Sequence, residues 1–473
     1  MQCFTNELSQ NDIFGIVSKE SDLLEVESYV IGGYVRDLLL KRNCKDIDFV
    51  TVGSGIQLAK NVTKRLGSKA KLSVYKNFGT ASIHFEGFEF EFVGARKESY
   101  RVDSRKPIVE DGTLEDDQNR RDFTINALAI SLNEATYGQL LDPFGGVNHL
   151  EKKIVKTPLD PKTTFSDDPL RMMRGIRFAS QLSFDVDPDT FQGLIDMKDR
   201  IGIISQERIT DELNKIILSK VPSYGFKLLF HSGLLAIIFP EMVKLHGVQK
   251  KNGKGHKDNF YHTLQVLDNI SEMTDNLWLR WAAILHDIAK PATQRFHEKA
   301  GWTFHGHEDL GAKWVPRIFK KLKLPLDERM KYVQKLVKLH LRPIALVSNK
   351  VTDSAVRRMV FEAGEDVNDL MTLCKADVTS KNSERVKKYQ QNFLLVEEKI
   401  REVEERDRVM NFQPPVTGEM ILDTFDIEPS KIIGDIKTEI KEAILDGKIT
   451  NDLDEARKMM MDLGVRMGLS LRK

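Results

Sequence analysis

Two aspartates separated by one residue, Asp46 and Asp48, carry the clearest chemistry in the sequence. On a β-strand, residues i and i+2 face the same side, so these carboxylates would lie side by side while Ile47 faces the core. Paired carboxylates suit Mg²⁺, which takes oxygen ligands from the protein and from substrate phosphates. Such ions can activate an attacking hydroxyl and stabilise a leaving pyrophosphate. An isolated D-x-D pair is also common at exposed strand edges and turns.

A glycine pair lies upstream of these aspartates, where the segment GYVRDLLLKRN begins with helical apolar spacing. Gly32 and Gly33 would let the backbone approach a triphosphate, and the N–H groups at the helix start would favour its negative charge. Arg36, one turn further on, can reach a phosphate oxygen. The glycine pair and the aspartate pair together predict a metal-dependent nucleotide site more strongly than either does alone.

A second group of polar residues forms the segment RRDFTINAL. Arg120 and Arg121 can bind the oxygens of a triphosphate, because a guanidinium donates several hydrogen bonds in one plane. Asp122 can accept a hydrogen bond from a ribose hydroxyl, and Asn126 can help to orient the sugar. The alternative is a basic helix start with two solvated arginines, but the preceding metal-site pattern favours the nucleotide interpretation.

These patterns together resemble a known family. The stretches GGYVRDLLL…DIDFV and RRDFTINA are similar to those of the nucleotidyltransferase branch (class II) that contains tRNA CCA-adding enzymes and bacterial poly(A) polymerases. The family implies a third carboxylate on a later strand, followed five residues on by an arginine. Glu91 and Arg96 fit this spacing, although the family residue is often Asp, and Glu89 is a competitor that faces the same way.

The segment DDPLRMMRGIRF resembles the family's base-recognition motif E-D-x-x-R, with Asp167 in place of Glu. Asp168 and Arg171 lie one helical turn apart and can face the same way. A carboxylate accepts and a guanidinium donates a hydrogen bond, which suits cytosine and adenine but not uracil and guanine. Arg174 and Arg177 would extend a basic stripe toward the triphosphate or the RNA end. The alternative is a capped helix with exposed arginines, because an Asp-Pro pair suits a helix start.

Histidines and aspartates are concentrated farther along the chain. Their order H…HD…H…H…D resembles that of an HD domain, a helical phosphohydrolase module that binds one or two divalent metals. The expected ligands are His262, His286, Asp287, His307, His340 and Asp377. His305 is an alternative to His307, and a single such histidine would most often be a hydrogen-bonded core residue. The resemblance implies a divalent transition metal such as Mn²⁺, Ni²⁺ or Co²⁺ and hydrolysis of cyclic phosphates or phosphomonoesters.

The elements that position these groups change character along the chain. The runs SYVIGG, KDIDFVTV, TASIHF and FEFEFV predict a mixed α/β head with a hairpin turn at Gly87. Residues 98–120 have no apolar period and predict a mobile loop, whereas helical spacing dominates from about residue 166. The predicted fold is α+β and multidomain: a nucleotidyltransferase head at 1–150, an all-helical neck at 151–235, an HD body at 236–380 and a helical tail at 381–473.

Composition sets broad limits. The 473 residues include 71 Lys+Arg and 70 Asp+Glu, and this net charge of +1 neither favours nor excludes RNA, for which a local basic groove suffices. No run of about 18 apolar residues indicates a membrane span, and the N-terminus has no secretory pattern. Cys3, Cys44 and Cys374 have neither disulfide nor zinc spacing and fit a cytoplasmic protein.

The residues and the resemblance together predict a tRNA nucleotidyltransferase that adds CCA to tRNA 3′ ends from CTP and ATP, with Mg²⁺ and without a nucleic-acid template. A poly(A) polymerase and a partial CC-adding or A-adding enzyme share the same motifs and are alternatives. A phosphohydrolase whose head only binds RNA is an alternative of another class, against which the intact Asp46 and Asp48 pair argues. The sequence does not indicate an oligomeric state.

Overall fold

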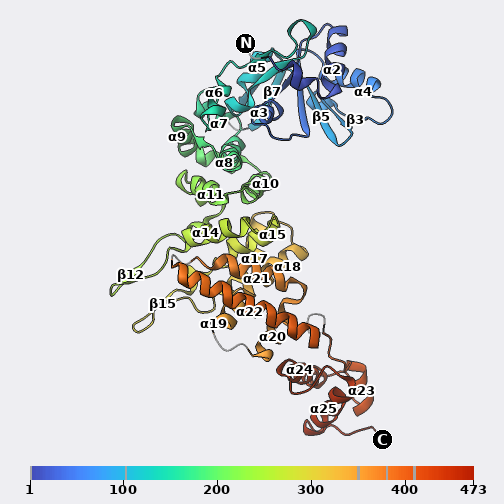
Figure 1. Ribbon diagram of the computed structural model, residues 1–473, viewed down its shortest axis with the longest axis vertical. Helices are drawn as coiled ribbons and strands as arrows, with labels where there is room; N and C mark the ends of the chain where they lie inside the picture. The colour runs from blue at the N-terminus through green and yellow to red at the C-terminus, as the bar shows by residue number, and fades with distance from the viewer. Residues whose placement is uncertain (1–2, 102–103, 349–351, 380–381, 408–411, 473) are drawn as a thin grey trace. The chain divides into compact units, whose positions relative to one another are not determined.

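The computed structural model describes residues 3–101, 104–348, 352–379, 382–407 and 412–472 (Figure 1). The chain divides into two compact units, Met1–Pro240 (unit 1) and Glu241–Lys473 (unit 2). The finer division into head, neck, body and tail remains a prediction. Within the described ranges, no helix has both the length and the apolar character needed to cross a membrane.

A seven-stranded sheet forms the head, in the order β3-β4-β5-β2-β1-β8-β9. Its strands are β1 (Ser28–Ile31), β2 (Asp46–Thr51), β3 (Lys71–Tyr75), β4 (Thr80–Phe85), β5 (Phe88–Gly94), β8 (Ala129–Ser131) and β9 (Leu140–Leu141). Neighbouring strands are antiparallel except for β2 and β5, which are parallel. The four predicted strand runs form β1, β2, β4 and β5, and Gly87, with φ +81°, makes the turn between the last two.

Alternation along β2 gives its two faces different surroundings. Ile47 and Phe49 are buried, and the Phe49 ring packs against Phe14 of α2 (Asp12–Leu23) and stacks on Phe92 with 4.8 Å between centroids. Helix α4 (Gly55–Leu66) packs on β4 and β5. Asp46 and Asp48 therefore extend from the opposite face of β2, as a two-residue period requires.

The segment at 98–120 differs from its prediction. Strand β6 (Arg96–Arg101) pairs antiparallel with β7 (Ser104–Asp111), and helix α5 (Leu114–Asn119) follows, with a capping box between Thr113 and Asp116. The prediction of a loop over this segment is therefore wrong. A two-stranded ribbon outside the main sheet is held by backbone hydrogen bonds, so its sequence needs no apolar alternation.

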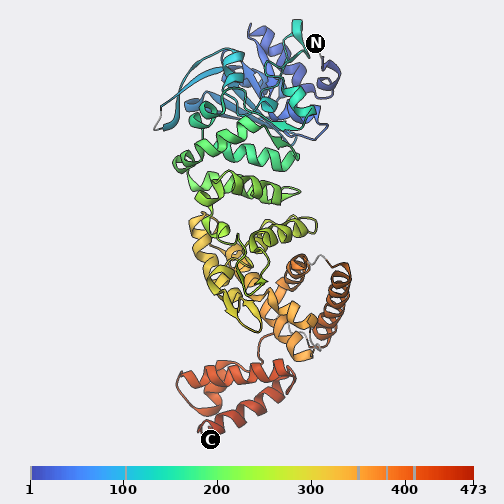
Figure 2. The ribbon, with the colours of Figure 1, turned by 90° about the vertical axis from the view of Figure 1, so that its left-hand side faces the viewer.

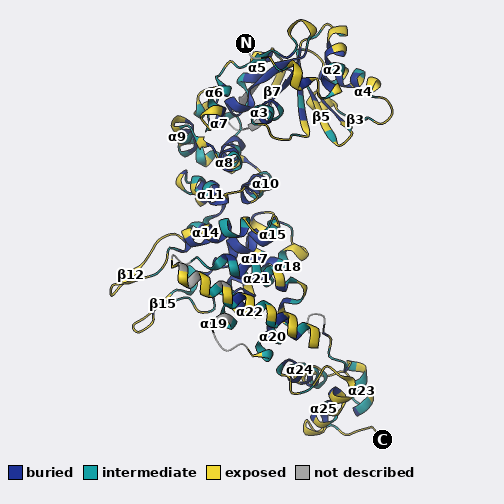
Figure 3. Cartoon of the chain, in the orientation of Figure 1, coloured by how far each residue is buried: buried dark blue, intermediate teal, exposed yellow. Residues whose placement is uncertain are grey.

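The predicted all-helical neck contains one short parallel strand pair, β10 (Ile154–Val155) with β11 (Asp185–Val186). Further helices complete unit 1. They are α3 (Gly33–Leu39), α6 (Gly146–Glu151), α7 (Pro161–Asp167), α8 (Leu170–Leu182), α9 (Pro188–Met197), α10 (Gln206–Ile217), α11 (Pro222–His231) and α12 (Leu234–Ile238). Along α8, Met172, Ile176 and Ala179 recur at helical spacing and are fully buried. Helix α8 packs on α10 and α11, and buried residues line all three helices (Figure 3). This packing fixes the rotation of α8 and therefore the direction of its arginines.

Unit 2 is mainly helical. Its helices include α14 (Asn259–Ser271), α15 (Leu277–Leu285), α17 (His307–Lys321), α18 (Glu328–Leu339), α19 (Leu341–Ser348), α20 (Asp353–Ala363), α21 (Val367–Asp377), α22 (Ser383–Asp407), α23 (Gly418–Phe425), α24 (Lys431–Asp446) and α25 (Leu453–Arg466). The last three pack on one another (Figure 2). Two short hairpins interrupt the predicted all-helical body: β12 (Lys250–Lys251) with β13 (Lys254–Gly255), and β14 (Arg295–His297) with β15 (Gly301–Thr303).

Candidate functional site

Four carboxylates share one face of the head sheet. The parallel register of β2 and β5 sets Asp48 beside Glu91 and Asp46 beside Glu89. Burial and the neighbouring charge of Asp46 raise the pKa of Asp48, and desolvation followed by the charge of Asp48 raises the pKa of Glu91. Glu89 lies at the start of β5, 3.6 Å from the Nε2 atom of His84. A divalent cation would relieve this repulsion, and oxygen donors are the ligands that Mg²⁺ prefers.

Gly32 brings the helix start close to these carboxylates. Its φ of +81° is strained for other residues, and an added Cβ would lie 2.7 Å from Arg121 Nη1 and 3.4 Å from Asp48 Oδ2. At Gly33 an added Cβ would meet only Arg36 Nη2, at 3.7 Å. The first glycine of the predicted pair is therefore the one that the close approach requires.

The predicted arginine pair is held by a buried aspartate. Asp117 is fully buried, and its two carboxylate oxygens accept hydrogen bonds from Arg120 Nε at 3.0 Å and from Arg121 Nε at 3.1 Å. Arg121 Nη1 also donates to the backbone oxygen of Asn126 at 3.3 Å. Sequence reasoning missed Asp117, although its spacing of three and four residues from the arginines is a recognisable signal.

Asp122 and Asn126 belong to one hydrogen-bond network. Asp122 accepts from Asn126 Nδ2 at 2.9 Å and from Arg174 Nε at 2.7 Å. Burial alone would raise the pKa of Asp122, but Arg174 and Asn126 lower it to about 2. Arg36 donates to Asn126 Oδ1 at 2.8 Å and to both oxygens of Asp37, so its guanidinium orients the amide. Phosphate binding by Arg36 remains a prediction.

One aromatic ring lies under three of the predicted arginines. The Phe178 centroid is 5.1 Å from the Arg36 guanidinium carbon, 5.4 Å from that of Arg174 and 4.1 Å from that of Arg177. Glu212 of α10 binds Arg177 Nε at 2.6 Å. Phe178 and Glu212 were not among the predicted site residues. Cation–π contacts and this ion pair hold the basic stripe in place, with Phe178 one and four residues from two of its arginines.

The predicted base-recognition pair has a less direct geometry. Helix α8 begins at Leu170 with Pro169 at the N-cap position, one residue later than predicted, and the Leu170 backbone N–H donates to the Asp168 carboxylate at 3.1 Å. Arg171 is only 8% exposed and donates to the backbone oxygens of Thr164 at 3.2 Å and Arg120 at 2.6 Å. Base recognition by Asp168 and Arg171 remains a prediction.

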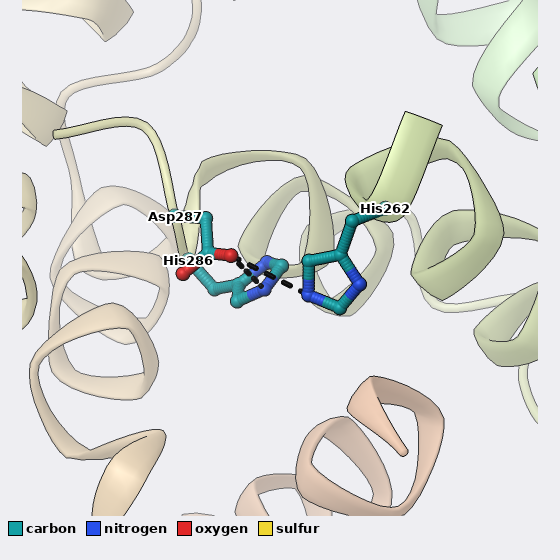
Figure 4. A group of neighbouring side chains, drawn as sticks. All are labelled: His262, His286 and Asp287. Carbon is teal, nitrogen blue, oxygen red and sulfur yellow. Dashed lines mark ion pairs between the residues drawn. The ribbon is translucent and has the colours of Figure 1, made fainter. Parts of the chain in front are cut away.

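The predicted histidine–aspartate cluster assembles from five places along unit 2. His262 lies on α14, His286 and Asp287 follow α15, His307 begins α17, His340 follows α18 and Asp377 ends α21. Two groups with metal-ligand spacing, His262–His286–Asp287 (Figure 4) and Asp287–His307–His340, share Asp287. His307 is buried in this cluster, whereas His305 is exposed.

The geometry of Asp287 fits one or two divalent metals. Its Oδ2 atom lies 3.4 Å from His262 Nε2 and 3.2 Å from His286 Nε2, and its Oδ1 atom lies 3.2 Å from His307 Nε2. His262 Nε2 is also 2.9 Å from Asp377 Oδ1. A carboxylate with ligand groups beside each oxygen is suited to bridge two ions.

Backbone hydrogen bonds fix the orientation of three of these rings. The Nδ1 atoms of His286, His307 and His340 each donate to a backbone oxygen three residues earlier at 2.7 Å. The Nε2 atoms of His307 and His340 therefore face each other at 3.3 Å. Burial would lower the pKa of His286, but the two aspartates raise it to about 10. Such oriented rings beside negative charge are typical of a metal site.

Comparison with known families agrees with this order of sites. Residues 28–156 match the poly A polymerase head domain. Residues 183–245 match the probable RNA and SrmB-binding site of polymerase A, and residues 259–382 match the HD domain.

Individual proteins are similar over most of the chain. The multifunctional CCA protein of Shewanella frigidimarina is 32% identical over 308 residues, covering 64% of this chain and 70% of that protein. The A-adding tRNA nucleotidyltransferase of Deinococcus radiodurans is 30% identical over 347 residues, covering 71% and 76%. A solved CCA-adding enzyme in complex with CTP aligns over 100% of this chain and 99% of its own, with 21% identity and a TM-score of 0.65, which shows a shared fold.

Proposed function

This chain belongs to the family of tRNA nucleotidyltransferases and poly(A) polymerases, and we propose that it completes tRNA 3′ ends by adding C, C and A from CTP and ATP. The observation that carries the proposal is the close approach at Gly32, where Asp48 and Arg121 both lie within contact distance of one backbone position. Carboxylates for cations and arginines for a triphosphate therefore meet at one place.

Each group has a part in the transfer. The 3′ oxygen of the tRNA forms a bond to the α-phosphorus as the bond to pyrophosphate breaks. Arg120 and Arg121, fixed by Asp117, bind the triphosphate oxygens. Asp46, Asp48 and Glu91 would hold divalent cations, which supply the charge that favours the attacking hydroxyl and the leaving pyrophosphate.

A nucleotide-by-nucleotide assay tests this function. Purified protein would receive tRNAs lacking the last three, two or one nucleotides, with CTP and ATP singly and together. We expect two C additions, one A addition and then a stop. Addition of A only to tRNA that already ends in CC would favour the A-adding alternative, which the similarity to the Deinococcus radiodurans protein supports. Long A tails on arbitrary RNA would overturn the proposal.

We also propose that the histidine–aspartate cluster hydrolyses phosphate esters at tRNA ends. The position of Asp287 in both groups of possible metal ligands carries this proposal. We propose that transfer takes place in the predicted head and neck, residues 1–235, and hydrolysis in the predicted HD body, residues 236–380. Because the proposed substrate is tRNA, we also propose a cytoplasmic location. If the purified protein held no transition metal and left 2′,3′-cyclic phosphates intact with Mn²⁺, Ni²⁺ and Co²⁺, this second activity would be excluded.

A further inference from the structure

Two β-hairpins extend from the helices of unit 2 and bind each other (Figure 1). Lys254 Nζ donates to the backbone oxygens of Glu298 at 3.0 Å and Lys299 at 3.1 Å. Trp302 Nε1 donates back to the Lys254 oxygen at 3.2 Å. We name residues 247–257 and 294–304 the basic arm. These hydrogen bonds join segments that are about 40 residues apart in the sequence into one structural element.

The basic arm has a strong charge bias in a chain that is nearly neutral overall. Its exposed cations outnumber its acidic groups six to one: Lys250, Lys251, Lys254, Lys257, Arg295 and Lys299, against Glu298. Two hairpins with so little negative charge to balance their lysines would attract a polyanion. The charge bias therefore indicates a binding surface and is not explained by the packing of the hairpins alone.

Aromatic rings alternate with these cations. Lys251 Nζ lies 5.0 Å from the Phe296 ring centroid, and Phe296 packs edge-on against Trp302 at 5.2 Å. His256 lies 5.8 Å from Trp302 and 5.6 Å from Phe304. Cations for phosphates and partly exposed rings for bases are the combination that binds single-stranded nucleic acid.

The basic arm leads to the histidine–aspartate cluster. Lys290 Nζ lies 5.6 Å from the Phe304 centroid and binds Asp287 Oδ2 at 2.6 Å. Lys257, the last residue of the arm's first segment, donates to His262 Nδ1 at 3.1 Å. Contacts therefore continue without a break from Phe296 to two of the predicted metal ligands.

We propose that the basic arm binds the single-stranded 3′ end of an RNA and guides its terminal phosphate to the histidine–aspartate cluster. The guiding step rests on the hydrolysis proposed above, whereas binding by the arm does not. The arm thereby makes an RNA end, and not a free nucleotide, the preferred substrate of the cluster. Charge and aromatic rings together favour RNA over an acidic peptide, which offers no bases to stack.

The test uses the full-length protein with the substitutions K250Q/K251Q/K299Q, which we call the arm variant. It keeps the hydrogen bonds of Lys254 and the two lysines that contact the cluster, Lys257 and Lys290. The control is K313Q/K320Q/K338Q, which removes three exposed lysines from α17 and α18 of the same unit. A short single-stranded RNA would carry a 2′,3′-cyclic phosphate and a terminal 4-thiouridine. We expect the arm variant to bind it about tenfold more weakly and with a salt slope shallower by about 2, because each lost single-strand phosphate contact contributes about 0.7.

Cross-linking and hydrolysis locate the effect. Irradiated 4-thiouridine should label the basic arm in the wild-type protein. The arm variant should hydrolyse the RNA end about tenfold more slowly than the wild-type protein. It should hydrolyse a mononucleotide 2′,3′-cyclic phosphate at an unchanged rate. Equal binding by the two lysine variants, or labelling only in unit 1, would overturn the proposal, as would inhibition by an acidic peptide but not by RNA. If no substrate is hydrolysed, the second activity fails, while the binding result alone still decides the role of the arm.

Discussion

Glu91 and Glu89 lie on the same face of β5, but they neighbour different aspartates. Glu91 is beside Asp48, which itself lies close to Gly32, whereas Glu89 is at the strand start near His84. We expect Asp48→Asn to slow A addition at least about a thousandfold, equivalent to about 4 kcal/mol, and Glu91→Gln to slow it at least about tenfold. The measurement is incorporation of labelled ATP into a tRNA that lacks only its last nucleotide.

Glu89→Gln is the matched control for this assignment. It removes the same charge from the same face two residues away. We expect A addition to change by less than about threefold, because Glu89 does not neighbour Asp48, and this change is well below the roughly 1.4 kcal/mol that a tenfold loss represents. A loss as large as that of Glu91→Gln would show that the third carboxylate has been assigned to the wrong residue.

Asp168 tests base selection at the residue scale. The cytosine amino group donates a hydrogen bond, and of this pair only the Asp168 carboxylate can accept it, because the Arg171 guanidinium is itself a donor. We expect Asp168→Ala to reduce the preference for CTP over UTP by about tenfold to a hundredfold, measured as the ratio of kcat/KM values. Glu207→Ala, which removes an exposed carboxylate from α10, should preserve the preference for CTP over UTP. Equal slowing with all nucleotides in Asp168→Ala would indicate only a capping role.

At the scale of elements, the start of α3 is the point where fold and chemistry depend on one residue. Gly32→Ala places a methyl group at a φ of +81° and 2.7 Å from Arg121 Nη1. We expect a loss of about 1–3 kcal/mol in the free energy of unfolding, together with a higher KM for ATP, because the arginine must move. Thermal melts and initial rates measure the two effects.

Gly33→Ala is the control within the same helix. Its added methyl group would meet only one flexible side-chain atom at an ordinary distance, and alanine favours a helix over glycine by about 1 kcal/mol. The stability should therefore be unchanged or increased, with ATP binding preserved. Equal damage from both substitutions would mean that the glycine pair acts through helix formation and not through close approach.

The elements that the sequence predicts best are those with one buried face. Strands β2 and β5 alternate apolar and acidic residues because one side packs on α2 and α4 and the other carries the carboxylates. The β6–β7 ribbon and the two hairpins of unit 2 lie outside that rule. Their regular structure comes from backbone pairing and from hydrogen bonds such as that of Lys254 with Glu298. These interactions join separate segments and leave no periodic pattern in the sequence.

The same limit applies to the site. Residue types and spacing identify Asp46, Asp48 and the arginine pair, because their chemistry is local. They do not reveal that Arg36 is bound to Asn126, which lies 90 positions away and meets it only through the packing of α3 beside the sheet. Roles that depend on such tertiary partners require the structure.

At the scale of the whole molecule, each compact unit contains its own candidate site. The carboxylates, arginines and α8 stripe lie in unit 1, and the histidine–aspartate cluster lies in unit 2. No described residue of either candidate site comes from the other unit. The two activities should therefore be separable by single substitutions.

Asp48→Asn and Asp287→Asn test this separation in the intact protein. Asp287 is fully buried between four histidines and Lys290, so its loss should reduce the bound transition metal, measured by mass spectrometry, by at least about tenfold. Nucleotide addition should stay within about twofold, because the carboxylates and arginines of the transfer site all belong to unit 1. Asp48→Asn should show the converse: normal metal content and no addition. If folded Asp287→Asn protein lost nucleotide addition as well, the two sites would be coupled, and a shared structural change would have to connect the units.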